Sequence, residues 1–200
     1  MNFCSDCGSK VSLQAVAGDN RQRFVCDGCG MTHYQNPNVL VATYVCVGES
    51  MLWIKRGTAP AAGKWAIPGG YMENDETPES GASRELLEET GIDVPAHEML
   101  LVSVSSILHM AQTHLVFRCH LEHRPDTVQT EEAVECAWFE EHDLPWEELA
   151  FASIEPHVRQ VYQWLRKGNY GIRVGFIDEN GSQYRNFPLA GATSTGQRNV

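Results

Sequence analysis

Three glutamates near the middle of the chain have the spacing of a metal-binding face. Glu85, Glu88 and Glu89 occupy positions i, i+3 and i+4, which share one side of an α-helix. Like charges held so close together repel each other unless a cation lies between them. Carboxylate oxygens are the ligands that hard divalent cations prefer. The spacing therefore predicts a helix that presents three carboxylates to a divalent cation.

Capping signals define the helix that carries these glutamates. Thr77 is a suitable N-cap, Pro78 fits the first helical position, and Gly91 suits the position after the last turn. Arg84 lies one turn before Glu88 and can orient its carboxylate. We expect a modest apolar stripe to face the core while the glutamates face away from it. The stripe consists of Ala82, Leu86 and Leu87.

The segment 70–92 resembles the Nudix box, the signature of the Nudix hydrolase family. It matches the pattern at every fixed position, namely Gly70, Glu76, Arg84, Glu85, Leu86, Glu88, Glu89, Gly91 and Ile92. The sequence just before it, WAIPGG at 65–70, also looks like the usual lead-in of the family. The competing interpretation is a solvated acidic helix on the surface. Such helices rarely come with this framing of glycines, arginine and proline.

The resemblance implies a Mg²⁺- or Mn²⁺-dependent hydrolase that cleaves the pyrophosphate bond of a nucleoside diphosphate linked to another group. It also implies the metal ligands, several of which are catalytic in the family. These are Glu85, Glu88, Glu89 and the Gly70 carbonyl. Arg84 and Glu76 match residues that mainly hold the box loop onto the helix.

The box does not fix the catalytic base or the substrate contacts. Some family members use a box glutamate as the base, and others use a later loop, where Glu132 and Glu135 could reach the metals. The alternative for both is a solvated loop. Arg56 is expected either to contact phosphate or to pair with a carboxylate. Trp65 and Tyr71 are candidates for stacking on a base, with packing in the core as an equal alternative.

Four cysteines near the N-terminus have the spacing of a structural zinc site. They are Cys4, Cys7, Cys26 and Cys29. Two Cys-x2-Cys pairs, each followed by glycine, predict a zinc ribbon over 1–36. So short a segment buries little core, so the metal would supply the folding energy. Two disulfides are the alternative, which a reducing compartment disfavours. His33 is not required, because four thiolates complete a tetrahedral site.

Length and charge bound the remaining expectations. A chain of 200 residues with 42% hydrophobic content suits one medium domain plus a small appendage. The formal charge of −11 argues against general nucleic-acid binding but allows a small nucleotide substrate, because bound metal can invert the local charge. The sequence has no apolar leader and no membrane-length apolar run, so we expect a cytoplasmic protein without a membrane partner. The resemblance adds a homodimer as an expectation.

Alternating strand-like and helix-like segments predict an α/β fold. Strands are expected at 39–47, 51–55, 99–108, 113–121 and 134–139. A second helix is expected over 155–167, with Ser153 as its cap and Gly168 as its stop. The resemblance implies a Nudix α/β/α sandwich with a mixed sheet over 37–168. For 169–200 we expect a hairpin around Asp178–Gly181 and a partly mobile tail.

Two branches of the family carry a ribbon before the box. NADH pyrophosphatases, some of which remove NAD caps from RNA, have a Ser-Gln-Pro-Trp-Pro-Phe-Pro motif after the box, whereas this chain reads VSSILHM at 104–110. The chain looks more similar to plant and bacterial FAD/ADP-ribose pyrophosphatases, which share YQNP after the ribbon and LAFASI before the last helix. The resemblance therefore favours FAD or ADP-ribose, giving AMP plus a phosphorylated product. The alternatives are an NADH or NAD-cap pyrophosphatase and a nucleotide-sensing regulatory domain.

Overall fold

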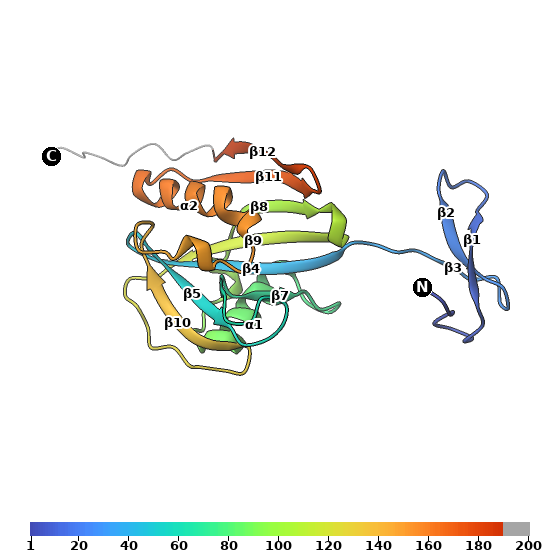
Figure 1. The fold of residues 1–200 in the computed structure, drawn as a ribbon, viewed down its shortest axis with the longest axis horizontal. Helices are drawn as coiled ribbons and strands as arrows, with labels where there is room; N and C mark the ends of the chain where they lie inside the picture. The colour runs from blue at the N-terminus through green and yellow to red at the C-terminus, as the bar shows by residue number, and fades with distance from the viewer. Residues whose placement is uncertain (190–200) are drawn as a thin grey trace. The chain divides into compact units, whose positions relative to one another are not determined.

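A computed structural model describes residues 1–189 of the chain. The chain divides into two compact units, Met1–Pro37 and Asn38–Val200, and each is described by itself (Figure 1). The expected tail at 190–200 lies outside the described residues, and its mobility stays a prediction.

The first unit, Met1–Pro37, is a three-stranded antiparallel sheet. Its strands are β1 (Val11–Ala15), β2 (Gln22–Cys26) and β3 (Thr32–His33). The buried side chains of this unit are those of Cys4, Cys26 and His33. Because these residues are cysteines and a histidine, the unit has no apolar core of its own, and its centre is the cysteine cluster.

The second unit is built on a mixed sheet of nine strands, in the order β10-β5-β4-β9-β8-β11-β12, with β6 paired to β5 and β7 to β4. The strands are β4 (Asn38–Val47), β5 (Ser50–Arg56), β6 (Trp65–Ala66), β7 (Gly69–Tyr71), β8 (Leu100–Ile107), β9 (Gln112–His120), β10 (Ala133–Phe139), β11 (Gly171–Asp178) and β12 (Gly181–Pro188). The β4–β9 and β8–β11 pairs are parallel, and the other pairs are antiparallel.

Helices cover both faces of this sheet (Figure 1). They are α1 (Pro78–Thr90), α2 (Glu155–Lys167) and the 3₁₀ turns η1 (Ala96–Glu98), η2 (Leu108–Met110), η3 (Trp146–Glu148) and η4 (Ala152–Ile154). Along β4, Ala42 and Tyr44 pack in the cluster that contains α2, whereas Val41 and Val45 pack in the cluster that contains α1. Since successive strand side chains point to opposite faces, the two helices lie on opposite sides. Within residues 1–189, no helix is long and apolar enough to cross a membrane.

Helix α1 begins and ends where its capping residues predicted. The Thr77 side chain accepts a hydrogen bond from Ser80 N at 3.2 Å, and Gly91 adopts a left-handed conformation with φ 75°. The predicted apolar stripe is wrong at one position, because Leu87 is 46% exposed while Ala82 and Leu86 are buried. Helix α1 is therefore held to the sheet by a narrow apolar face.

Helix α2 has the predicted bounds, but not the predicted cap. Ile154 is its N-cap, and no side chain caps the first turn, so the expectation for Ser153 is wrong. Gly168 ends the helix in a left-handed conformation, as predicted. The predicted hairpin is present as β11 and β12, and β11 pairs in parallel with β8. The hairpin thus continues the main sheet instead of standing apart from it.

Candidate active site and metal centres

Arg84 joins the box glutamates to the loop that precedes α1. Its Nη1 donates to both Glu85 Oε1 (2.8 Å) and Glu88 Oε2 (2.9 Å). Its Nε and Nη2 donate to the two carboxylate oxygens of Glu76 at 3.0 and 2.8 Å, and Nη2 also donates to the Tyr71 carbonyl at 3.2 Å. The Arg84 guanidinium holds the pKa of Glu76 below its usual range. One side chain thus brings two box carboxylates together and ties the loop to the helix.

The two glycines of β7 lie directly against the glutamates of α1. Gly69 N donates to Glu89 Oε2 at 2.8 Å. A Cβ at Gly70 would lie 2.5 Å from Glu85 Oε1, and a Cβ at Gly69 would overlap the backbone carbonyl of Val41. Glycine is therefore required at both positions, because only a bare backbone leaves room for the carboxylates and for the neighbouring strand.

The three glutamates differ in exposure more than the sequence indicated. We expected all of them to face away from the core. Glu88 does so, with its side chain 58% exposed, whereas the Glu85 side chain is 12% exposed and Glu89 is 5% exposed. The expectation is wrong for Glu85 and Glu89, because β7 packs over the helix face on which they lie.

Burial and mutual repulsion shift the protonation of these carboxyls. Burial raises the pKa of Glu89 to about 8, and the charges of Glu85 and Glu132 add to the rise. The Gly69 N–H and the Arg56 charge oppose it. Burial also raises the pKa of Glu85, against the effect of the neighbouring arginine. Two carboxyls that resist ionisation in this way favour a cation beside them, because a cation reverses both effects.

Of the two candidate bases, one lies near the box. Glu132 O accepts a hydrogen bond from Gly57 N at 2.8 Å, just after β5 ends. Its charge contributes to the raised pKa of Glu89, so it lies within electrostatic range of the box. Glu135 instead forms a salt bridge with Lys55 at 3.0 Å and is 49% exposed. Of the two, Glu132 acts electrostatically on the box, whereas the Glu135 carboxylate is paired with Lys55.

The three proposed substrate contacts have different environments. The Arg56 charge lowers the pKa of Glu89, so Arg56 borders the box. Trp65 is only 4% exposed and packs edge-on against Phe139, with the ring centroids 5.0 Å apart. Trp65 therefore packs in the core, which is the second of the two alternatives that the sequence left open for it. Tyr71 is 52% exposed and remains open to a ligand.

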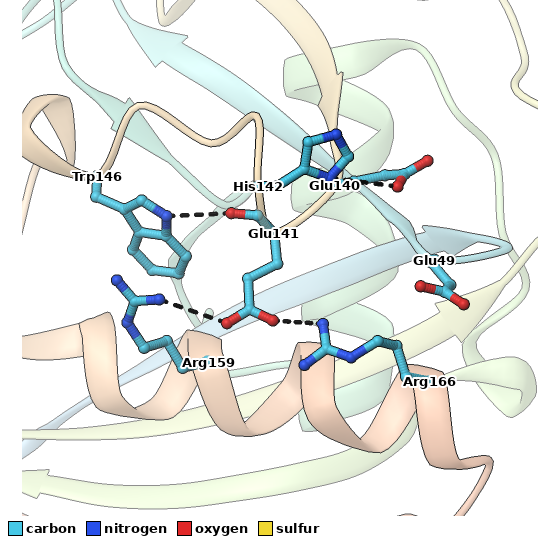
Figure 2. A pocket seen from close by; sticks show the side chains of 7 residues that line it. All are labelled: Glu49, Glu140, Glu141, His142, Trp146, Arg159 and Arg166. Atoms are coloured by element: carbon cyan, nitrogen blue, oxygen red, sulfur yellow. Dashed lines mark hydrogen bonds and ion pairs between the residues drawn. The ribbon is translucent and has the colours of Figure 1, made fainter.

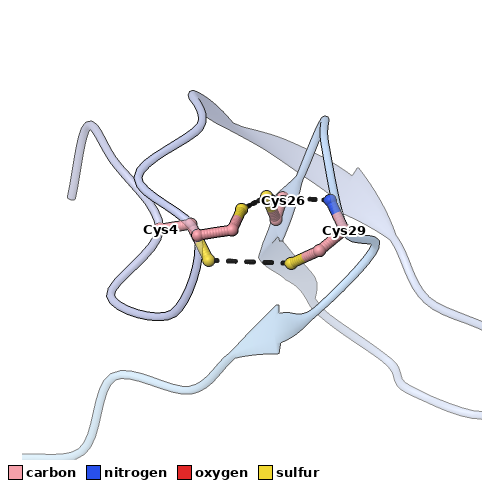
Figure 3. Close-up of side chains that lie close together, drawn as sticks. Cys4, Cys26 and Cys29 are labelled. Atoms are coloured by element: carbon pink, nitrogen blue, oxygen red, sulfur yellow. Dashed lines mark hydrogen bonds between the residues drawn. The ribbon is translucent and has the colours of Figure 1, made fainter.

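The four cysteines of the first unit meet as their spacing predicted (Figure 3). Cys7 Sγ lies 3.4 Å from Cys26 Sγ, Cys4 Sγ lies 3.8 Å from Cys29 Sγ, and all four sulfurs lie within 4.8 Å of one another. Tetrahedral zinc with bonds of about 2.3 Å to sulfur needs a cluster of this size. All four are free thiols, so the disulfide alternative is not realised.

Hydrogen bonds to the sulfurs surround this cluster. Gly28 N and Cys29 N each donate to Cys26 Sγ at 3.3 Å. His33 Nε2 lies 3.2 Å from Cys4 Sγ, and the His33 side chain is buried. The sequence indicated only that His33 is not required as a ligand, and the spacing did not predict this contact. The imidazole lies beside the cluster and contacts the sulfur of Cys4. The four cysteines still form the complete tetrahedral set, and His33 is a neighbour of one ligand.

A cavity of about 430 Å³ lies at the other end of the strands from the box. Figure 2 shows Glu141 between Arg159 and Arg166 of α2, with the Trp146 indole donating to the Glu141 carbonyl at 3.1 Å. The remaining lining residues are Glu49, Glu140 and His142. None of the box glutamates lines this cavity. Glu141 pairs with Arg166 and shares Arg159 with Glu155, and these ion pairs connect α2 to the segment after β10.

Comparisons with known proteins agree with both halves of the chain. The NUDIX domain family matches residues 35–165, and the Nudix N-terminal zinc-ribbon family matches residues 2–35. A crystal structure of a NUDIX hydrolase from Nitrosomonas europaea is 36% identical and superposes with a TM-score of 0.81 over 90% of this chain and 100% of that one.

Two curated relatives have named activities. The NAD-capped RNA hydrolase NudC of Stutzerimonas stutzeri is 28% identical over 72% of this chain and 49% of its own length. The ADP-ribose pyrophosphatase of Methanocaldococcus jannaschii is 40% identical over 36% of this chain and 43% of its own length. The chain thus spans about half the length of these two relatives. Since these two family models together span residues 2–165, the chain belongs to the Nudix family and carries the N-terminal zinc ribbon found in part of that family.

Proposed function

We propose that this protein hydrolyses the pyrophosphate bond of a nucleoside diphosphate linked to a sugar or a second nucleoside. One observation carries the proposal. Glu85, Glu88 and Glu89 converge on one face of α1, where Arg84 and the Gly69 backbone hold them in place. A regulator that only bound nucleotides would not need three carboxylates kept close together against their repulsion.

The box residues fit a divalent cation. Mg²⁺ or Mn²⁺ would be held by the three glutamates and the Gly70 carbonyl, an all-oxygen set that these hard ions prefer. The Glu85 carboxylate lies directly against the bare backbone of Gly70, which supports this fit. When bound, such a cation neutralises phosphate charge and lowers the pKa of water. The four thiolates of the ribbon fit Zn²⁺ in a closed structural site.

The protein residues have separate tasks in this proposal. Water attacks one phosphorus of the pyrophosphate, the bond to the bridging oxygen breaks, and the water proton passes to a carboxylate. Glu132 is our candidate for that carboxylate, because its charge acts on Glu89 and its backbone is hydrogen-bonded to Gly57 at the end of β5. Arg56 borders the same cluster and would bind a phosphate oxygen. We assign no role in the reaction to Glu135, whose carboxylate is paired with Lys55.

FAD and ADP-ribose are the first pair of candidate substrates, each yielding AMP and a phosphorylated product. The YQNP and LAFASI segments support this choice, as does the partial match to an ADP-ribose pyrophosphatase. NADH and NAD-capped RNA form the second candidate, which the longer match to NudC favours equally.

A substrate panel tests the proposal. The protein is incubated with Mg²⁺ and FAD, ADP-ribose, NADH or NAD-capped RNA, and the products are identified by mass spectrometry in ¹⁸O-labelled water. We expect AMP or the corresponding monophosphate end, with one ¹⁸O in a product phosphate. Glu88→Gln is the inactive control. Failure to cleave any of the four substrates would refute the proposal.

A further inference from the structure

A chain of three polar side chains leads from the interior of the sheet to the loop of the box. Gln112 Nε2 donates to the Tyr71 hydroxyl at 2.7 Å, and Gln112 Oε1 lies 2.9 Å from His114 Nε2. Gln112 is 8% exposed, whereas Tyr71 is 52% exposed. These hydrogen-bonded side chains therefore run from a buried glutamine to the hydroxyl of an exposed tyrosine.

Strand pairing explains why these side chains meet. Leu40 of β4 pairs with Tyr71 of β7 on one side and with His114 of β9 on the other. Residues paired across neighbouring strands point to the same face, and Gln112 lies two positions before His114 in β9, so it shares that face. The pairing of the strands thus sets the relative positions of these three side chains.

The side-chain amide of Gln112 fixes which group donates and which accepts in these hydrogen bonds. Because the Gln112 nitrogen faces Tyr71, its oxygen accepts from His114, which must then donate through Nε2. Burial lowers the pKa of His114, and this favours the neutral ring with a single N–H. The Tyr71 oxygen is therefore an acceptor within the chain, and its own proton is left to donate outward.

Tyr71 is also joined to the box. It follows Gly70, and its carbonyl accepts from the Arg84 guanidinium, which also donates to Glu85 and Glu88. The backbone of Tyr71 therefore lies beside the guanidinium that holds two of the box glutamates. In a nucleoside diphosphate derivative a sugar is attached directly to the diphosphate, and the oxygens of that sugar accept hydrogen bonds.

We propose that the Tyr71 hydroxyl donates a hydrogen bond to a sugar oxygen of the substrate, and that Gln112 and His114 are positioning residues that aim it. This inference rests on the proposed function, because it assigns a contact within the same site. It differs from base stacking, which the sequence suggested for Tyr71, because it depends on the hydroxyl and not on the ring.

Removing only the hydroxyl tests the contact. Tyr71→Phe is expected to raise KM about tenfold and to leave kcat within about twofold, because the lost interaction binds the ground state and the transition state alike. Tyr184→Phe is the matched control, since Tyr184 lies in the same row of the sheet face and its hydroxyl contacts Ser105 at 3.5 Å. It should leave KM unchanged. An unchanged KM for Tyr71→Phe overturns the contact.

A double-mutant cycle tests the positioning role. Gln112→Leu should raise KM in the wild-type background and have no further effect in the Tyr71→Phe background, because both changes remove the same interaction. His114→Gln retains a donor and should keep KM near the wild-type value, whereas His114→Leu should raise it. Additive effects of Gln112→Leu and Tyr71→Phe would overturn the role, since thermal unfolding separately reports any loss of fold.

Wild-type turnover separates this inference from the function beneath it. If the wild type cleaves none of the four substrates, the proposed function fails and the contact falls with it. If the wild type is active and Tyr71→Phe has the same KM, only the assigned contact fails.

Discussion

The ribbon and the box stabilise closely spaced acidic groups in different ways. In each, several acidic groups lie close together, four thiols in one and three carboxyls in the other. The ribbon surrounds its sulfurs with backbone N–H groups and His33. The box places the cation Arg84 between Glu85 and Glu88.

This difference indicates which site is permanent and which is transient. The ribbon unit has no apolar core, so zinc would be part of its fold. The box stands on a packed sheet with Ala82 and Leu86 buried beneath it, so its fold does not depend on a metal. We therefore expect zinc to stay through purification and the catalytic cation to exchange freely.

A chelator should give the largest contrast between the two sites. Brief treatment with EDTA should abolish turnover, and added Mg²⁺ should restore it, because carboxylate ligands release a hydrated ion readily. The zinc content, measured by elemental analysis, should remain one per chain. Restoration that required Zn²⁺ in place of Mg²⁺ would contradict the assignment of the two metals.

Neutralising one box ligand should lower activity and leave the fold unchanged. Glu88→Gln is expected to reduce kcat by about a hundredfold or more, because the substituted amide binds a divalent cation poorly. Its side chain is 58% exposed, so the unfolding midpoint should change little. Glu73→Gln, an exposed position in the same loop, is the control and should retain full activity. Wild-type kcat for Glu88→Gln would remove the metal assignment.

Removing a zinc ligand should unfold the ribbon and leave the protein catalytically active. Cys26→Ser should lose zinc and hydrogen-exchange protection throughout Met1–Pro37, because the unit has no other centre. We expect kcat to change by less than about tenfold, since the catalytic side chains belong to the other unit. Cys136→Ser, which removes a cysteine from β10, should keep its zinc. Retained zinc in Cys26→Ser would count against the ribbon site.

A smaller effect should appear in the pH dependence of stability. The pKa of Glu89 is raised to about 8 from 4.5, so the stability it contributes is full below pH 4.5 and is lost as the pH rises through 8. Metal-free protein should therefore lose up to about 5 kcal/mol of unfolding free energy across this window, at about 1.4 kcal/mol per pKa unit. Glu89→Gln or saturating Mg²⁺ should flatten the profile in urea titrations. Equal slopes for wild type and Glu89→Gln would show that Glu89 is not the cause.

Local signals predicted the elements better than they predicted burial. Thr77, Pro78 and Gly91 marked the ends of α1 because capping depends on the residues themselves. The burial of Glu89 was missed, because it depends on β7 packing over the helix, a contact between segments that periodicity does not report. For the same reason the spacing suggested neither the pairing of Glu141 with two arginines nor the contact of His33 with Cys4.

The hydrogen bonds among Tyr71, Gln112 and His114 could have been predicted in part from the sequence of β9. Gln112, Thr113 and His114 begin a strand that reads QTHLVFRCH, and such a polar start is unusual for a central strand of a covered sheet. That pattern signals a polar partner on one face. The identity of the partner, Tyr71, follows only from the pairing of β7, β4 and β9.

The contacts of Arg84 also bear on protein engineering. Its three nitrogens serve Glu76, Glu85, Glu88 and the Tyr71 carbonyl together, which a lysine with one nitrogen cannot do. If α1 alone were grafted onto another scaffold, this guanidinium would lack its loop partners. The glutamates would also lack the backbone of Gly69 and Gly70, against which they lie. The smallest portable module is therefore the loop and helix together, from Gly69 to Gly91.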